Sequence, residues 1–290
     1  MLSGHTKEKG ERLVLYIAIG SFILHLLLIY LTKFGLIQIE GAGSLLSNPV
    51  AAIYTPFSFI LVYEVYLLIF YLPKSITTYI RKQYEIITLI VIRRIFKDLS
   101  NLELSSDWFE IKYDLQFTYD IIASLLLFLL LYLFHSKSKI PQLKSEEKDS
   151  SAKVERFVSL KRKIAQVLVP VLLLLAIYTV GFWALATIAP DLIPNYDFKD
   201  INNIFFDEFF ALLIIVDMIL LLVSLFHTDE FHKVIRNSGF IISTILIRLS
   251  FSVTGLINTA LIITAVLFGL LILLIHNQYE LNRKKLGLED

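Results

Sequence analysis

Residues 239–276 read GFIISTILIRLSFSVTGLINTALIITAVLFGLLILLIH, and this apolar stretch decides the class of fold. A helix crosses the hydrocarbon core of a bilayer with about 20 predominantly apolar residues. The stretch is nearly twice that long, and Arg248 is its one Lys, Arg, Asp or Glu. It therefore predicts a hairpin of two membrane spans, with the turn near Thr254 and Gly255.

Further apolar runs precede this hairpin along the chain. The chain is 56% hydrophobic with a mean hydropathy of +0.70, whereas a soluble domain is about 45–50% apolar. The sequence therefore predicts an all-α integral membrane protein. Residues 75–99 are ambiguous between a full span and a re-entrant segment, because charges flank their short apolar centre. The clear runs cover residues 13–36, 51–73, 116–135, 164–188 and 206–227.

The distribution of Lys and Arg decides between these two alternatives, because short cytoplasmic loops are enriched in both residues. If residues 75–99 span the membrane, the chain makes eight crossings and both termini lie on one side. That side then carries 20 of the Lys and Arg residues, and the other side carries four. We therefore expect cytoplasmic termini in a multi-pass protein. A bacterial inner (plasma) membrane suits a small Ile-, Lys- and Phe-rich chain without a targeting presequence.

The distribution of charge also divides the chain into two halves. Residues 136–163 are polar and carry nine of the cations, so they predict a flexible cytoplasmic linker. They separate a four-helix half over residues 1–135 from a second four-helix half over residues 164–290.

The two predicted halves resemble each other in the register of their charges. Residues 87–96 and 242–251 are identical at five of ten positions, and Arg93 aligns with Arg248. Glu64 precedes Arg93 by 29 residues, and Asp217 precedes Arg248 by 31. This register predicts a parallel internal repeat, although a shared membrane composition would also produce some of the likeness.

Glu64, Arg93, Asp217 and Arg248 are expected near the middle of the bilayer, judged from a helix rise of about 1.5 Å per residue. An unpaired ion there costs from about 3 to more than 10 kcal/mol. We therefore expect Glu64 to pair with Arg93, and Asp217 to pair with Arg248. Such groups either line an ion or proton path or form fixed salt bridges that hold the helices together.

Five more residues are candidates for the same path. Arg94 gives the third span an uncompensated cation, which indicates access of water. His25 lies at a similar depth in the first span, as a proton relay or as a histidine bonded to a neighbouring helix. Asp120, Asp207 and Glu208 form an outer acidic mouth that would attract cations, unless acids occupy outer segments simply because Lys and Arg avoid them.

The remaining observations exclude several classes of function. The chain has no cysteine, and it contains neither a phosphate-binding glycine loop nor a hydrolase motif. We therefore predict no enzyme, cofactor, metal centre or nucleic-acid partner. The expected function is a channel or secondary transporter for an inorganic cation or a proton, as a monomer or a homo-oligomer. The alternative is a membrane scaffold or regulatory subunit, in which the buried pairs are structural.

Overall fold

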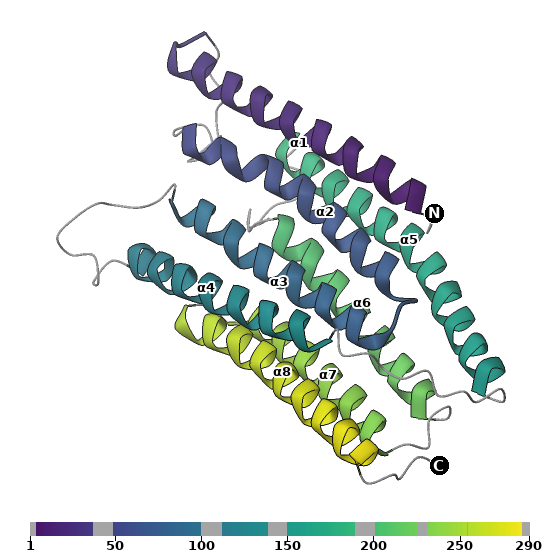
Figure 1. The fold of residues 1–290 in the computed structure, drawn as a ribbon. Coiled ribbons are helices and arrows are strands. Elements are labelled where there is room, and N and C mark those ends of the chain that lie inside the picture. Colours follow the sequence, from purple (N-terminus) through teal and green to yellow (C-terminus); the bar gives the residue numbers. More distant parts are fainter. Residues whose placement is uncertain are drawn as a thin grey trace.

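The computed structural model of the chain is a bundle of α-helices (Figure 1). Within the residues that the structure describes, all regular secondary structure is helical, which confirms the predicted all-α class. The described residues are 4–36, 49–99, 112–138, 150–188, 201–225, 231–253 and 255–285.

Each predicted apolar run coincides with a helix. Three of the helices, α1, α4 and α8, are long and apolar enough to cross a bilayer, which indicates a membrane protein. The bounds are α1 Gly4–Lys33, η2 Pro49–Ile53, α2 Tyr54–Tyr71, α3 Ile76–Leu99, α4 Lys112–Ser138, α5 Ser150–Ile188, α6 Ile201–Leu225, α7 Phe231–Ser250 and α8 Leu256–Lys285.

The turn between α7 and α8 lies where the sequence predicts it. Gly255 has a φ of +73°, in the left-handed region that glycine adopts without strain. Just after it, the side-chain amide of Asn258 donates a hydrogen bond of 2.5 Å to the carbonyl of Ser250. The same carbonyl accepts the backbone N–H of Val253 at 3.3 Å, so two hydrogen bonds close the end of α7.

The segment of residues 75–99, which the sequence left ambiguous, contains α3, one continuous helix of 24 residues. At about 1.5 Å per residue it is roughly 36 Å long. Its buried positions include Tyr79, Ile80, Tyr84, Ile87 and Val91, and they recur at the three- and four-residue spacing of a helix with one buried side.

Helix α5 begins at Ser150, inside the segment predicted to be a flexible linker. Residues 150–163 are therefore helical and continuous with the apolar run that follows. The reason is visible in the sequence, where Val154, Phe157 and Val158 continue the helical spacing of apolar residues. The polar composition of the segment concealed this periodicity.

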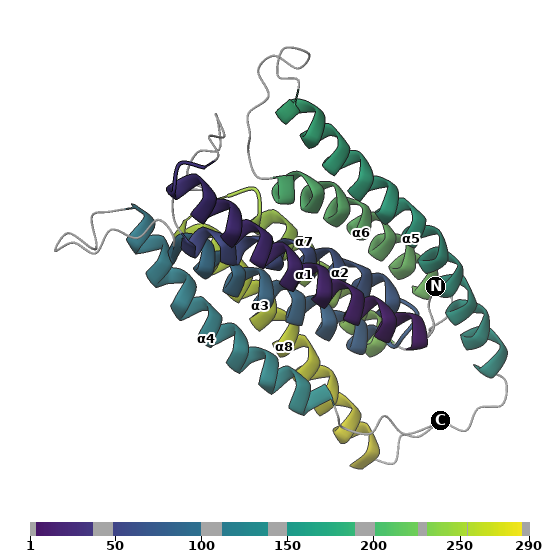
Figure 2. The same cartoon turned by 90° about the horizontal axis from the view of Figure 1, so that it is seen from above.

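The helices pack in two series that follow the chain. Helix α1 packs on α2, α2 on α3 and α3 on α4, and α5 to α8 repeat this order. The series meet mainly where α4 lies beside α8 (Figures 1 and 2), with further contacts of α2 with α5 and of α3 with α7. Successive helices run in opposite directions, so the start of α1 and the end of α8 lie at the same end of the bundle.

A close helix contact joins α3 to the α7–α8 hairpin at Gly269. A Cβ atom added to Gly269 would lie 1.7 Å from the hydroxyl oxygen of Tyr84. That hydroxyl bonds to the Oγ of Ser243 at 2.7 Å, and Ser243 donates to the carbonyl of Ala265 at 2.6 Å. The ring of Tyr84 also meets Phe134 of α4 edge-to-face, with centroids 5.2 Å apart. Four helices therefore converge on one tyrosine.

We expect Gly269→Ala to lower the thermal unfolding midpoint of the detergent-solubilised protein. Overpacking of a filled interior costs about 1–3 kcal/mol, which exceeds the gain of up to about 1 kcal/mol from replacing glycine by alanine in a helix. Gly20→Ala is the matched control, because a Cβ there meets nothing within 4 Å. Equal midpoints for the two variants would contradict the close contact.

Candidate functional site

Glu64 is a buried carboxylate on α2 that faces a cavity between α1, α2 and α3. The cavity has a volume of about 230 Å³, much more than the roughly 10–15 Å³ that one water molecule requires. Glu11 and Glu85 also line it, and Lys82 is the one cation among the lining residues. Glu85 is ion-paired to Lys82 and Arg81, so the site combines the carboxylates of Glu64 and Glu11 with space for water or a small ion.

Arg93 lies on the neighbouring helix α3 and is buried like Glu64. Its positive charge acts on the Glu64 carboxyl across the contact between α2 and α3. The structure thus places the two predicted partners on adjacent helices, within electrostatic range of each other. Arg93 is not among the residues that line the cavity, so the acid, and not the arginine, faces the open space.

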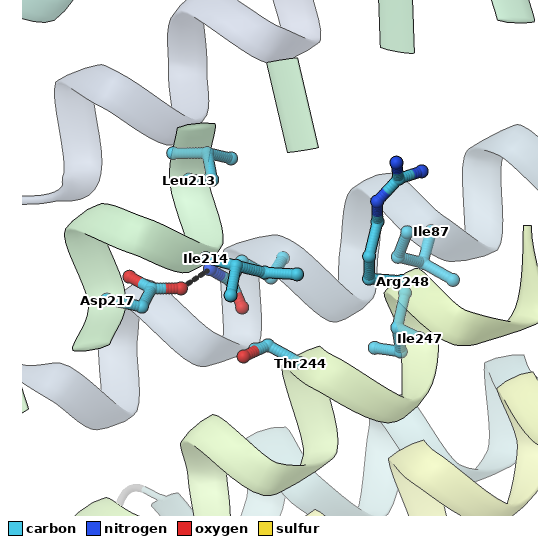
Figure 3. A pocket seen from close by; sticks show the side chains of 8 residues that line it. Ile87, Leu213, Ile214, Asp217, Thr244, Ile247 and Arg248 are labelled. Carbon is cyan, nitrogen blue, oxygen red and sulfur yellow. Dashed lines mark hydrogen bonds between the residues drawn. The ribbon is translucent and has the colours of Figure 1, made fainter. Parts of the chain in front are cut away.

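Asp217 of α6 is the corresponding buried acid of the second series. The side-chain amide of Gln83 donates a hydrogen bond of 3.2 Å to Asp217 (Figure 3), and the hydroxyl of Tyr79 lies beside the same carboxyl. Both neighbours come from α3, so Asp217 links the two series of helices. It also lines a cavity of about 20 Å³, which is enough for about one water molecule.

Arg248 does not take the place that the sequence predicted. It lines the same small cavity as Asp217, but Figure 3 shows its guanidinium turned away from that carboxyl. The cation that acts electrostatically on Asp217 is Lys161 of α5. Counting residues from the loops estimates the depth of a side chain, but it does not show to which side of the helix that side chain points.

Lys161 is itself buried, near the end of α2. Its ammonium group donates a hydrogen bond of 3.2 Å to the carbonyl of Lys74. Its positive charge also acts on the Asp217 carboxyl of α6. A lysine from the predicted linker is therefore part of the polar contact between α5, α2 and α6.

Arg94 and Asp120 form the most complete polar contact in the described residues. Arg94 binds Asp120 through Nε and, at 2.5 Å, through Nη2. The expectation of an uncompensated Arg94 is therefore wrong. Asp120 is 0% exposed, so it belongs to this pair and not to an exposed acidic mouth.

The start of α8 completes this contact. Arg94 Nη1 donates to the side-chain oxygen of Asn258 at 2.5 Å, and Nη2 lies 3.4 Å from the hydroxyl of Thr259. On the other side, the amide of Gln116 donates to Asp120 at 2.9 Å. Helices α3, α4 and α8 are therefore joined around one guanidinium group.

His25, Asp207 and Glu208 are the remaining residues predicted for the path. His25 Nδ1 lies 2.5 Å from the hydroxyl of Thr55, so it contacts α2 from α1; this is the geometry of a histidine bonded to a neighbouring helix. Asp207 and Glu208 lie on α6, but their side chains are outside those that the structure describes.

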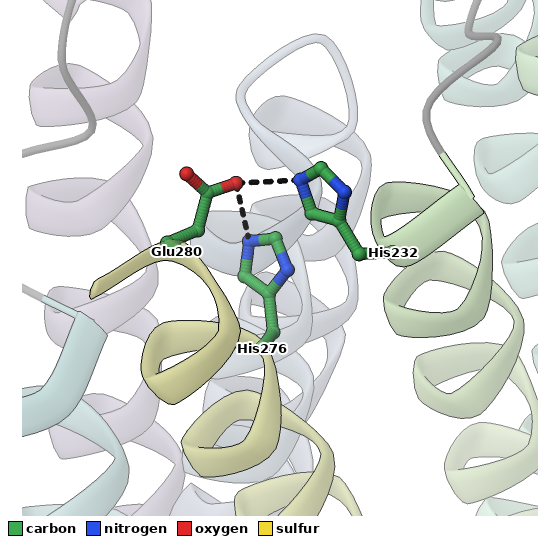
Figure 4. A group of neighbouring side chains, drawn as sticks. All are labelled: His232, His276 and Glu280. Atoms are coloured by element: carbon green, nitrogen blue, oxygen red, sulfur yellow. Dashed lines mark hydrogen bonds and ion pairs between the residues drawn. The ribbon is translucent and has the colours of Figure 1, made fainter. Parts of the chain in front are cut away.

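One cluster was not predicted from the sequence. His232, His276 and Glu280 come together where α7 begins and α8 nears its end (Figure 4). The spacing of His276 and Glu280 places them on one face of a helix, and this was the available signal. His232 is 44 residues away from His276, and only the pairing of α7 with α8 brings the two together.

No protein-family model, curated protein or solved structure matches this chain.

We expect Asp120→Asn to destabilise the protein strongly, because it leaves the Arg94 guanidinium without its anion. Breaking one side of a buried pair costs about 3–5 kcal/mol. Asp120 is 0% exposed and the Arg94 side chain is 27% exposed, so we expect a loss of about 3 kcal/mol, the lower end of that range. Glu85→Gln is the control, because Glu85 pairs with Lys82 at a side chain that is 29% exposed, where a pair contributes about 0–1 kcal/mol. Unfolding in increasing denaturant measures both, and a similar loss in both variants would contradict the special role of Asp120.

Proposed function

We propose that this protein is a channel or secondary transporter that passes a cation or a proton across the membrane. The observation that carries the proposal is the surroundings of Glu64. A buried carboxylate beside a cavity of about 230 Å³, with Glu11 as a second acid, suits transient binding of a cation or a proton. Arg93, behind the acid, would oppose the entry of anions.

The proposed path needs helices that cross the membrane, and we assign all eight α-helices as spans. Their alternating directions support this assignment, together with the common end at which α1 starts and α8 stops (Figure 1). The sequence supports it too, because this arrangement places 20 Lys and Arg residues on the cytoplasmic side and four on the other side. Helices α2, α3, α6 and α7 are shorter than α1, α4 and α8, whereas α5 is longer.

A pair of Arg–His contacts supports the proposed internal repeat. Arg81 of α3 lies 2.9 Å from His135 of α4, and Arg236 of α7 lies 2.9 Å from His276 of α8. The two arginines are 155 residues apart, which is also the offset of the aligned third spans. Each series thus joins its third and fourth helices by the same contact, at the same end of the bundle.

The topology can be tested with single cysteines, because the chain has none of its own. We expect Ser145→Cys to react with a membrane-impermeant maleimide only in inside-out vesicles. Ser105→Cys should react only in right-side-out vesicles. Labelling of both positions from the same side would contradict the eight-span arrangement and the cytoplasmic termini.

The path can be tested by cation and proton flux into liposomes that contain the purified protein. We expect Glu64→Gln to reduce the flux by about tenfold or more, since the amide cannot exchange a proton or attract a cation as the carboxylate does. Asp217→Asn should reduce it as well. Glu155→Gln is the control, because it removes the same charge at an exposed position on α5.

Two results would contradict different parts of the proposal. Wild-type flux no higher than that of empty liposomes would exclude passage of the ions tested. Wild-type flux that neither substitution changes would keep the activity and exclude these acids as the site.

The second candidate function is a non-transporting scaffold or regulatory subunit. The closed hydrogen-bond network of Arg94, Asp120, Asn258 and Thr259 favours it, because a charge satisfied in this way is structural. In that case Glu64→Gln changes stability without changing flux, and the protein co-purifies with a fixed partner.

A further inference from the structure

The cluster of His232, His276 and Glu280 lies away from the proposed path, at the end of the bundle where α8 stops. His232 Nε2 is 2.6 Å from Glu280 Oε1, and His276 Nε2 is 4.0 Å from the same oxygen. One nitrogen or oxygen from each of the three residues lies within 4.8 Å of the others. Figure 4 shows the carboxylate facing the two rings.

We propose that these three residues bind a divalent transition metal ion, with Zn²⁺ as the best fit. Two imidazoles and one carboxylate are a ligand set that zinc accepts, with a fourth position left for water. Bond lengths of about 2.0–2.2 Å around a tetrahedral ion place the ligand atoms roughly 3.3 Å apart. The separations of Glu280 Oε1 from His232 Nε2 (2.6 Å) and from His276 Nε2 (4.0 Å) lie on both sides of that value. Small rotations of the side chains would therefore complete the site.

The two histidines are already held in position. The rings of His232 and His276 stack with centroids 5.3 Å apart, and His232 also stacks on Tyr279 at 4.8 Å. His276 is 5% exposed, whereas the side chain of Glu280 is 36% exposed. An ion could therefore reach the histidines from the side of Glu280. In the described part of the chain, the buried Nδ1 of His276 has no hydrogen-bond partner.

Two cations stand near the cluster and compete with a metal ion. Arg236 Nη1 lies 2.9 Å from His276 Nε2, so it occupies the lone pair that the metal needs. Lys233 adds further positive charge. Arg236 also donates to the side-chain oxygen of Asn237 at 3.1 and 3.2 Å. These bonds to Asn237 can hold the guanidinium when a metal ion binds His276. Because Arg236 competes with the metal ion for His276, we expect metal binding to strengthen when the charge of Arg236 is removed.

The first series of helices lacks the matching cluster. There Arg81 contacts His135 as Arg236 contacts His276. Yet Thr77 stands 155 residues before His232, and Lys139 stands four residues after His135 where Glu280 follows His276. The positions of the first series that match His232 and Glu280 therefore hold neither a histidine nor a carboxylate. The extra histidine and carboxylate occur in one series only, and metal binding accounts for both.

The test is calorimetric titration of tag-free, chelator-treated protein in detergent with zinc chloride. We expect one Zn²⁺ per chain for the wild type. His232→Ala and Glu280→Gln should weaken binding by about tenfold or more, since each removes one of three ligands. His135→Ala is the matched control and should bind as the wild type does. Arg236→Gln should bind at least as tightly as the wild type.

The absorption spectrum of bound Co²⁺ gives a second readout, because tetrahedral coordination by nitrogen and oxygen has its own visible bands and a merely structural cluster would show none. Absence of stoichiometric binding to the wild type would overturn the proposal. Unchanged affinity in both His232→Ala and Glu280→Gln would overturn it too, as would an equal loss in His135→Ala. None of these outcomes depends on whether the protein transports ions.

Discussion

The ion pair of Arg94 with Asp120 is the interaction on which the joining of the helices most depends. It lies between α3 and α4, and Asn258 and Thr259 extend it to α8. Since α4 and α8 form the main contact between the two series, this one guanidinium group holds both series together at that point. A charge in an apolar surrounding is costly unless an opposite charge and hydrogen-bonding groups lie within reach. The positions of Asp120, Asn258 and Thr259 are therefore more tightly constrained than those of apolar residues in the core.

Much of the fold follows from hydropathy and from the count of Lys and Arg. The apolar runs, the turn at Gly255 and the helical character of residues 75–99 all come from the length of apolar sequence that a membrane requires. The start of α5 at Ser150 was not predicted, because the polar residues of the segment hide the spacing of Val154, Phe157 and Val158. In that case the composition was a weaker guide than the periodicity.

The candidate site was predicted only in part, and the reason is geometric. Distance along a helix gives the depth of Glu64 or Asp217, but the choice of partner depends on rotation about the helix axis and on neighbouring helices. Asp217 meets Gln83 of α3 instead of Arg248. Arg94 finds Asp120 across 26 residues of sequence, and His232 finds Glu280 across 48. Contacts of this range are set by helix packing.

The packing around Gly269 has a mechanical consequence. Tyr84 is held by Ser243 and Phe134 against a glycine that admits no larger side chain, so contacts at this one residue join α3, α4, α7 and α8 into a block. Helix α1, by contrast, packs chiefly on α2 and η2 and exposes many of its large apolar residues. The cavity of Glu64 lies between these two parts. A small rocking of α1 and α2 against the block would therefore widen or narrow the space before that carboxylate, with the core acting as a fixed frame.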